Sequence, residues 1–119
     1  VTSKQKLQEL AQISPYAGCA AHAPMAIVTA YHEDGCRFPQ YAQIDLAIAM
    51  ENMWLAAQSL GLGGVWLGVA PEEDRMAMVE KILAIEPGQR AFAIFPIGYP
   101  AEEKHPQDRF KVERIHYIK

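Results

Sequence analysis

The sequence predicts one domain in which helices and strands alternate around a single sheet. Residues 43–69 form an almost uninterrupted apolar run that reads as a long helix, a glycine stop and a buried strand. Two further apolar runs, residues 25–31 and 91–100, have the length and composition of buried strands. With 119 residues and 50% hydrophobic content, the chain is long enough for one core and too short for two domains of ordinary size.

The N-terminal part predicts a helix followed by a strand. Residues 3–13 carry apolar side chains at helical spacing, and Pro15 follows them, so a first helix is expected there. Pro24 then introduces the apolar strand over residues 25–31, which ends in the polar turn HEDGCRFPQ.

The central helix is expected to begin near Tyr41 and to end near Leu60, with Gly61 as a left-handed C-cap. Its polar side chains form only narrow rows, and apolar residues cover most of its circumference. We therefore expect this helix to be covered on several sides, most simply by a second subunit. A core helix in a monomer is the alternative. A membrane span is disfavoured because Asp45 and Glu51 interrupt the run before the ~18 apolar residues that a span needs.

The C-terminal half predicts a strand, a helix, a strand and an extended tail. A strand over residues 64–69 should follow the glycine turn, and Pro71 can occupy the first position of the next helix. The strand over residues 91–100 contains Pro96, which favours an edge strand or a bulge. After the charged linker AEEKHPQD, residues 110–118 read as a final extended segment.

Composition narrows the functional classes. A net charge of −3 without a cluster of Lys and Arg argues against nucleic-acid binding. Two cysteines are too few for a disulfide framework, and the N-terminus lacks the apolar core of a signal peptide, which favours a cytoplasmic protein. Because the chain opens on Val1 and runs directly into a polar helix, we expect it to be a piece of a longer protein.

Most residues that could carry chemistry fit a simpler structural role. The glycines between residues 61 and 68 follow a helix, whereas phosphate loops precede one, so they are best interpreted as a C-cap and close packing. Gly68 differs, because near the end of a strand it lets another group approach the main chain. Cys19 and His22 are separated from His32 and Cys36 by a strand of ~23 Å, too far for one zinc site. No nucleophile triad is visible. Arg109 could clamp a phosphate, although a surface salt bridge is nearly as good an interpretation.

Three stretches of the sequence resemble the FMN-dependent nitroreductase family. They are the strand region APMAIV, the central block IDLA…ENMWLAA…LGLGGVWLG, and the closing segment PIGYPAE with DRF and RIHY in the tail. The resemblance covers essentially the whole chain. It implies an α+β fold: an α-β-α sandwich with a mainly antiparallel sheet, which dimerises through the long central helix from Tyr41 to Leu60.

The same resemblance implies FMN at the subunit interface and NAD(P)H as electron donor. Hydride would pass to flavin N5 and then to a small-molecule acceptor such as a nitroaromatic or quinone, so no dedicated catalytic residue and no metal is expected. The residues implied at the flavin are Trp66, Leu67, Gly68 and Val69, and Arg109 at its phosphate, with Arg114 as a less favoured substitute.

The sequence departs from the family at its beginning. Relatives carry an N-terminal helical region, rich in arginine and serine, that holds the flavin phosphate, and this chain starts after it. We therefore expect a single nitroreductase-like domain over residues 1–119 that is N-terminally truncated. Two alternatives stay open: a non-catalytic dimeric binding module on the same scaffold, and an unrelated small α/β domain.

Overall fold

The structure is a computed structural model that describes residues 1–118. The chain alternates helices and strands, as the sequence predicts. The regular elements are, in order, α1 (Lys4–Leu10), β1 (Met25–His32), α2 (Ala42–Ser59), β2 (Gly63–Gly64), β3 (Leu67–Gly68), α3 (Glu73–Leu83) and β4 (Gln89–Gly98). Short 3-10 turns form η1 (Ala17–Ala21), η2 (Pro39–Tyr41) and η3 (Val112–Arg114).

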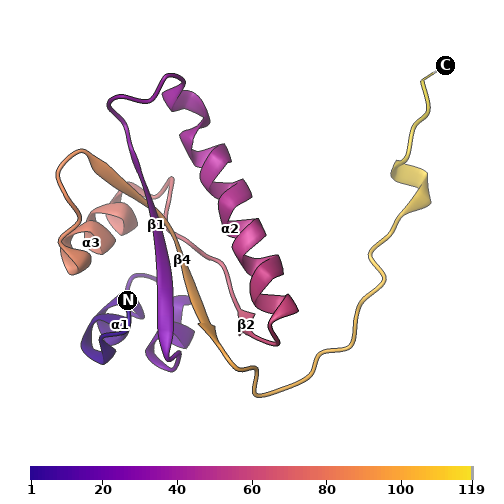
Figure 1. The fold of residues 1–119 in the computed structure, drawn as a ribbon, viewed down its shortest axis with the longest axis horizontal. Coiled ribbons are helices and arrows are strands. Elements are labelled where there is room, and N and C mark those ends of the chain that lie inside the picture. The colour runs from indigo at the N-terminus through magenta and orange to yellow at the C-terminus, as the bar shows by residue number, and fades with distance from the viewer. Residues whose placement is uncertain (119) are drawn as a thin grey trace.

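The strands form one antiparallel sheet with β4 at its centre. β1 pairs with one edge of β4, and the two short strands β2 and β3 pair with the other. α2 covers one face of the sheet, and α1 and α3 lie on the opposite face (Figure 1). The predicted α-β-α sandwich with a mainly antiparallel sheet is therefore confirmed.

Each face of the sheet carries its own apolar core. On the α2 side, Met50 and Ala57 of the helix pack against Phe95, which is fully buried. On the opposite side, Leu10 of α1 and Met76 of α3 meet the residues of β1 and β4 that point the other way. β4 is buried along most of its length because it has a covered layer on both faces.

The helices lie close to their predicted bounds. α1 begins after Ser3, whose hydroxyl accepts from the Lys6 N–H, and it ends at Leu10, where the chain tightens into shorter turns. α2 ends as predicted, with Gly61 at φ +72 in the left-handed region. α3 begins at Glu73 with Glu72 as its N-cap, so Pro71 lies before the helix and not at its first position as predicted. Within residues 1–118, no helix has the length and hydrophobicity of a membrane span.

Two details of the sheet differ from the predictions. The strand expected over residues 64–69 is divided into β2 and β3, because Val65 and Trp66 leave the ladder between them. Pro96 lies neither on an edge strand nor at a bulge: it belongs to central β4, and the register shift occurs at Thr29 and Ala30 of the partner strand. The Pro96 carbonyl accepts from the Val65 N–H at 3.4 Å, so the proline nitrogen faces the same gap between β2 and β3. The missing N–H therefore costs no hydrogen bond in the ladder between β1 and β4.

The chain after β4 leaves the body of the domain. Residues 101–118 run away from the sheet as an extended arm, interrupted only by η3 (Figure 1). Every side chain in this arm is exposed, including Phe110 and Tyr117. The predicted final extended segment is thus present, but it adds no strand to the sheet.

Candidate functional site

Gly68 turns its main-chain groups toward the open edge of the sheet. It lies in β3, where Leu67 pairs with Ile94 and Gly68 with Ala93. The next residue, Val69, donates its N–H to the Phe92 carbonyl at 3.3 Å, so the odd-numbered positions of this segment face β4. In an antiparallel ladder, the intervening residue points its N–H and C=O the other way. Gly68 therefore offers a backbone donor to anything that approaches this edge.

Space around Gly68 is also open. A Cβ built on Gly68 would meet no atom within 4 Å, whereas one on Gly64 would lie 2.5 Å from the Phe95 ring. Gly64 is thus required by packing, but Gly68 is not. A flat group could approach the Gly68 main chain closely without displacing any side chain.

The four residues predicted at the flavin divide into two pairs. Leu67 and Val69 are buried, and their side chains belong to the core on the α1 and α3 side. They can contribute only main-chain groups to a site at the edge. Trp66 packs on the opposite face of the sheet, on the same side as the open face of Gly68, with its ring edge-on to Phe92 at 5.8 Å. Of the four residues, Trp66 and Gly68 are therefore the two that face the same side of the sheet.

The structure does not bring the predicted phosphate ligands to this strand within one chain. Arg109 and Arg114 lie on the exposed arm that leaves the domain (Figure 1). Within residues 1–118, the Arg109 guanidinium donates a hydrogen bond to its neighbour Gln107 at 3.3 Å. Their roles at a flavin phosphate stay predictions.

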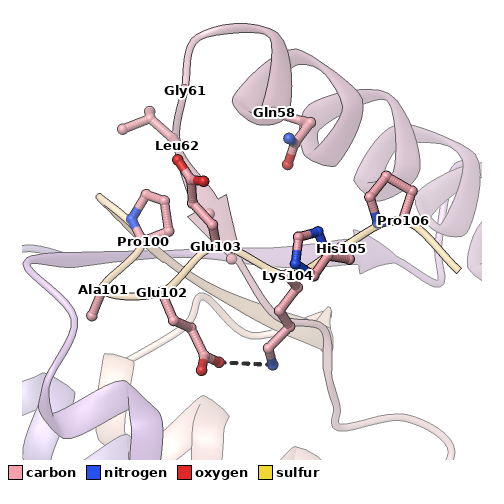
Figure 2. A pocket seen from close by; sticks show the side chains of 12 residues that line it. Gln58, Gly61, Leu62, Pro100, Ala101, Glu102, Glu103, Lys104, His105 and Pro106 are labelled. Atoms are coloured by element: carbon pink, nitrogen blue, oxygen red, sulfur yellow. Dashed lines mark ion pairs between the residues drawn. The ribbon is translucent and has the colours of Figure 1, made fainter.

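A wide groove of about 1010 Å3 lies at the base of the arm, apart from Gly68. The glycine turn after α2 forms one wall, and residues 100–106 of the arm form the other (Figure 2). Glu102 and Lys104 form an ion pair of 3.0 Å on this second wall, and both side chains are largely exposed. The groove is open to solvent and its ion pair is exposed, so its residues do not form an enclosed site.

Sequence reasoning missed the cluster of charges around Arg90. This arginine, at the start of β4, donates to Glu80 at 3.1 Å, to Glu33 at 3.2 Å and to Glu73. Hydrogen bonds that Arg90 donates to Glu73 and Glu80 raise the pKa of Arg90 above its ordinary value, against the opposing effect of burial. Glu33 follows β1, whereas Glu73 and Glu80 belong to α3 and Arg90 to β4, so no local motif predicts the cluster.

A second arginine that the sequence did not single out lies at the Gly68 edge. Arg75 of α3 reaches the Gly68 carbonyl with Nη1, in a long contact of 3.5 Å. No spacing or motif distinguishes Arg75 from a surface cation, and only the fold places it here. Among residues 1–118, no group of three or more His, Cys, Asp or Glu side chains is arranged to hold a metal ion.

The site thus consists of a main-chain donor, an open flat approach, one aromatic side chain and one cation. It contains no paired acid and base and no activated nucleophile, so by itself it can bind and orient a planar group but has no evident means of bond cleavage. Chemistry at such an edge has to come from a bound cofactor or substrate.

Comparison with known proteins gives the same family that the sequence motifs resemble. The sequence pattern of the nitroreductase family matches residues 2–99. A candidate NADH dehydrogenase/NAD(P)H nitroreductase of Methanothermobacter thermautotrophicus is 36% identical over 119 residues, and the chain spans 62% of its length. A protein of the same name from Archaeoglobus fulgidus is 33% identical, and the chain covers 69% of it.

Solved structures agree. The crystal structure of a candidate NADH oxidase from Clostridium acetobutylicum has a TM-score of 0.93 at 32% identity, covering 100% of this chain and 72% of the other. An FMN-dependent nitroreductase from Clostridium difficile shares the fold with a TM-score of 0.89 at 24% identity, over 100% of this chain and 72% of that one. These matches in sequence and in fold have one consequence: the chain belongs to the nitroreductase family.

Proposed function

We propose that this chain forms part of an FMN-dependent NAD(P)H oxidoreductase. When bound, FMN would supply two-electron transfer through N5 from NAD(P)H to a nitroaromatic, a quinone or a similar small acceptor. The observation that carries the proposal is the Gly68 edge, where an outward N–H and an open face meet in one residue. Membership of the nitroreductase family supports the same assignment.

The residues at this edge fit a flavin ring in part. The Gly68 N–H would hold the ring edge by a hydrogen bond, and the absence of a side chain leaves room for close approach. Trp66, packed against Phe92, would limit water at the same face. The two arginines predicted at the flavin phosphate, Arg109 and Arg114, lie on the arm and not at this edge of their own chain (Figure 1).

A second copy of the chain would complete the site. The outer face of α2 exposes apolar side chains that the domain does not cover: Ile44 at 55%, Ile48 at 57%, Leu55 at 61% and, at the helix end, Leu60 at 73%. Contiguous exposed apolar residues on one helix are typical of a protein–protein interface. We therefore propose a homodimer through the helix from Tyr41 to Leu60.

The exposed arm suits this dimer. Its apolar residues are exposed in the single chain, Phe110 at 73% and Val112 at 70%. Residues 108–118 contain three Arg and Lys against two acidic residues, whereas α2 contains Asp45 and Glu51 and no basic residue. Opposite charges favour docking of the arm onto the second subunit. In that position Arg109 of one chain would serve the Gly68 edge of the other.

A mixing experiment tests the assignment of Arg109. In a mixed dimer of Gly68→Val and Arg109→Ala chains, only an arginine acting across the interface leaves one complete site. Random exchange of equal amounts makes about half of the dimers mixed, each with one complete site out of two, so mixing the two defective variants should restore FMN binding to about a quarter of the wild-type amount. Failure of the mixture to bind FMN, with both variants folded, would show that Arg109 does not act across the interface.

A non-catalytic binding module is the second candidate. The observation that favours it is the separation of Arg109 and Arg114 from Gly68 within one chain. NAD(P)H oxidation with added FMN and an acceptor such as a quinone separates the two: turnover supports the oxidoreductase, and its absence with intact dimers supports the module. The exposed free thiols of Cys19 and Cys36 support a reducing, cytoplasmic location for either.

A further inference from the structure

Arg75 is placed differently from the other charged residues of α3. Glu73 in the first turn of this helix and Glu80 further along it both form ion pairs with Arg90 of β4. Arg75 itself, half-buried at the same end of the helix, has no carboxylate within 4.0 Å among residues 1–118. Glu72 and Asp74, its neighbours in sequence, are exposed and form no ion pair with it. Its charge is therefore not neutralised by a direct partner.

The polar contact that Arg75 makes is with the Gly68 carbonyl. Nη1 lies 3.5 Å from that oxygen, and the oxygen points to the same open edge as the Gly68 N–H. A group that accepts from this N–H would lie roughly 6–8 Å from the guanidinium, by the ordinary dimensions of one peptide unit and one hydrogen bond. At such a distance near a protein surface, a charge still contributes appreciably to the energy of a neighbouring ion.

Arg75 also contacts the one residue of this segment that is not anchored, because Leu67 and Val69 are buried in the core whereas Gly68 turns its main-chain groups away from β4. β3 contains two residues and pairs with β4 on one side only, and Gly68 has no side chain to pack. α3, by contrast, is fixed to the sheet by the Arg90 contacts to two of its turns. A side chain from a rigid helix that reaches the Gly68 carbonyl restrains the one glycine at the site.

We propose that Arg75 is a positioning residue for the flavin edge, which fixes the Gly68 main chain and places a positive charge beside the group that binds there. This inference rests on the proposed function and deepens it. Reduction of an oxidised flavin by two electrons and one proton leaves one negative charge on the ring. Arg75 stabilises that charge, so the bound cofactor is easier to reduce by NAD(P)H than it would be beside a neutral side chain.

The test compares Arg75→Gln with Arg75→Lys and with Lys81→Gln. Lys81 is an exposed cation of the same helix, so its substitution removes the same charge away from Gly68. The two quantities are the dissociation constant for FMN, from fluorescence titration, and the midpoint potential of bound FMN, from dye equilibration. Thermal unfolding of each cofactor-free variant checks that it folds.

The inference predicts that Arg75→Gln weakens FMN binding about tenfold and lowers the midpoint potential, with both effects reduced in concentrated salt. Arg75→Lys should recover most of the potential, and Lys81→Gln should match the wild type in both quantities. If the wild type binds FMN but Arg75→Gln leaves the affinity and the midpoint potential unchanged, the inference about Arg75 is wrong and the proposed function still stands. If the wild type binds no FMN, the proposed function fails together with it.

Discussion

Gly64 lies directly against the ring of Phe95, so closely that a Cβ on the glycine would come within 2.5 Å of Cε2 and Cζ and within 2.9 Å of the Pro96 carbonyl oxygen. Phe95 is fully buried under α2, where it also packs on Trp54 at 5.6 Å between ring centroids. The ring therefore has no free space into which to retreat. The approach of β2 to the central strand depends on the missing side chain at this position.

Gly64→Ala should destabilise the protein by about 1–3 kcal/mol, because the added methyl group overpacks the α2 side of the core. Gly68→Ala is the matched control: the same methyl group is added in the same segment, where no atom lies within 4 Å. Its free energy of unfolding in urea should differ from that of the wild type by less than about 0.5 kcal/mol. Equal losses for the two variants would contradict this account of the glycines.

The Arg90 cluster should contribute unequally through its three partners. Glu80 and Arg90 are each about three-quarters buried, with exposed fractions of 25% and 23%, whereas Glu73 is 75% exposed. Glu80→Gln should therefore cost about 1–3 kcal/mol of unfolding free energy, and Glu73→Gln less than about 1 kcal/mol. Denaturant unfolding of the two variants checks the order, and a larger loss for Glu73→Gln would refute it.

Stability that comes from the charge of Arg90 should not vary across the neutral pH range. The folded state raises the pKa of Arg90 above its ordinary value, so this contribution is complete at every pH below the ordinary arginine pKa. It is lost only as strongly alkaline pH passes through the raised value. In unfolding measurements from weakly acidic to weakly alkaline pH, the difference between wild type and Arg90→Leu should not fall as the pH rises.

The exposed face of α2 predicts the effect of a charge on self-association. Ile48→Asp places a carboxylate at a position that is 57% exposed in the single chain and would be buried in the proposed dimer. Sedimentation equilibrium should show a shift toward monomer by at least tenfold in the dissociation constant. Tyr16→Asp, at a residue 81% exposed beside η1, is the control and should leave the dimer unchanged. A wild-type protein that is already monomeric would contradict the proposed interface.

Patterns in the sequence predicted the elements that depend on local chemistry. The central helix could be predicted almost to the residue, because apolar spacing and the left-handed glycine at Gly61 are both local signals. The division of the next strand into β2 and β3 could not, since it follows from how Val65 and Trp66 meet β4. The prediction that Pro96 marks an edge strand or a bulge was wrong for a similar reason. The proline is tolerated in the central strand because its nitrogen faces Val65, which belongs to a segment distant in the sequence.

The candidate site shows the same division. The sequence predicts Gly68 as a place of open approach to the main chain, and a Cβ there would meet no atom within 4 Å, while its role at a flavin stays a prediction. Arg75 and Arg90 carry no motif, and their partners lie on other elements of the fold. Arg109 was singled out by its guanidinium and assigned to the flavin phosphate by the resemblance, and its place on the arm outside the body of the domain is visible only in three dimensions (Figure 1).

The most direct measurement is the visible absorption spectrum of the purified protein, before and after addition of FMN and removal of the excess by desalting. The spectrum of the Gly68→Val variant is recorded beside it. We predict that the wild type retains flavin absorption and that Gly68→Val, equally folded, retains at most about a tenth of it, because the added side chain occupies the open face of Gly68. A wild-type protein that stays colourless, or a variant that holds flavin as well as the wild type, would contradict a flavin site at Gly68.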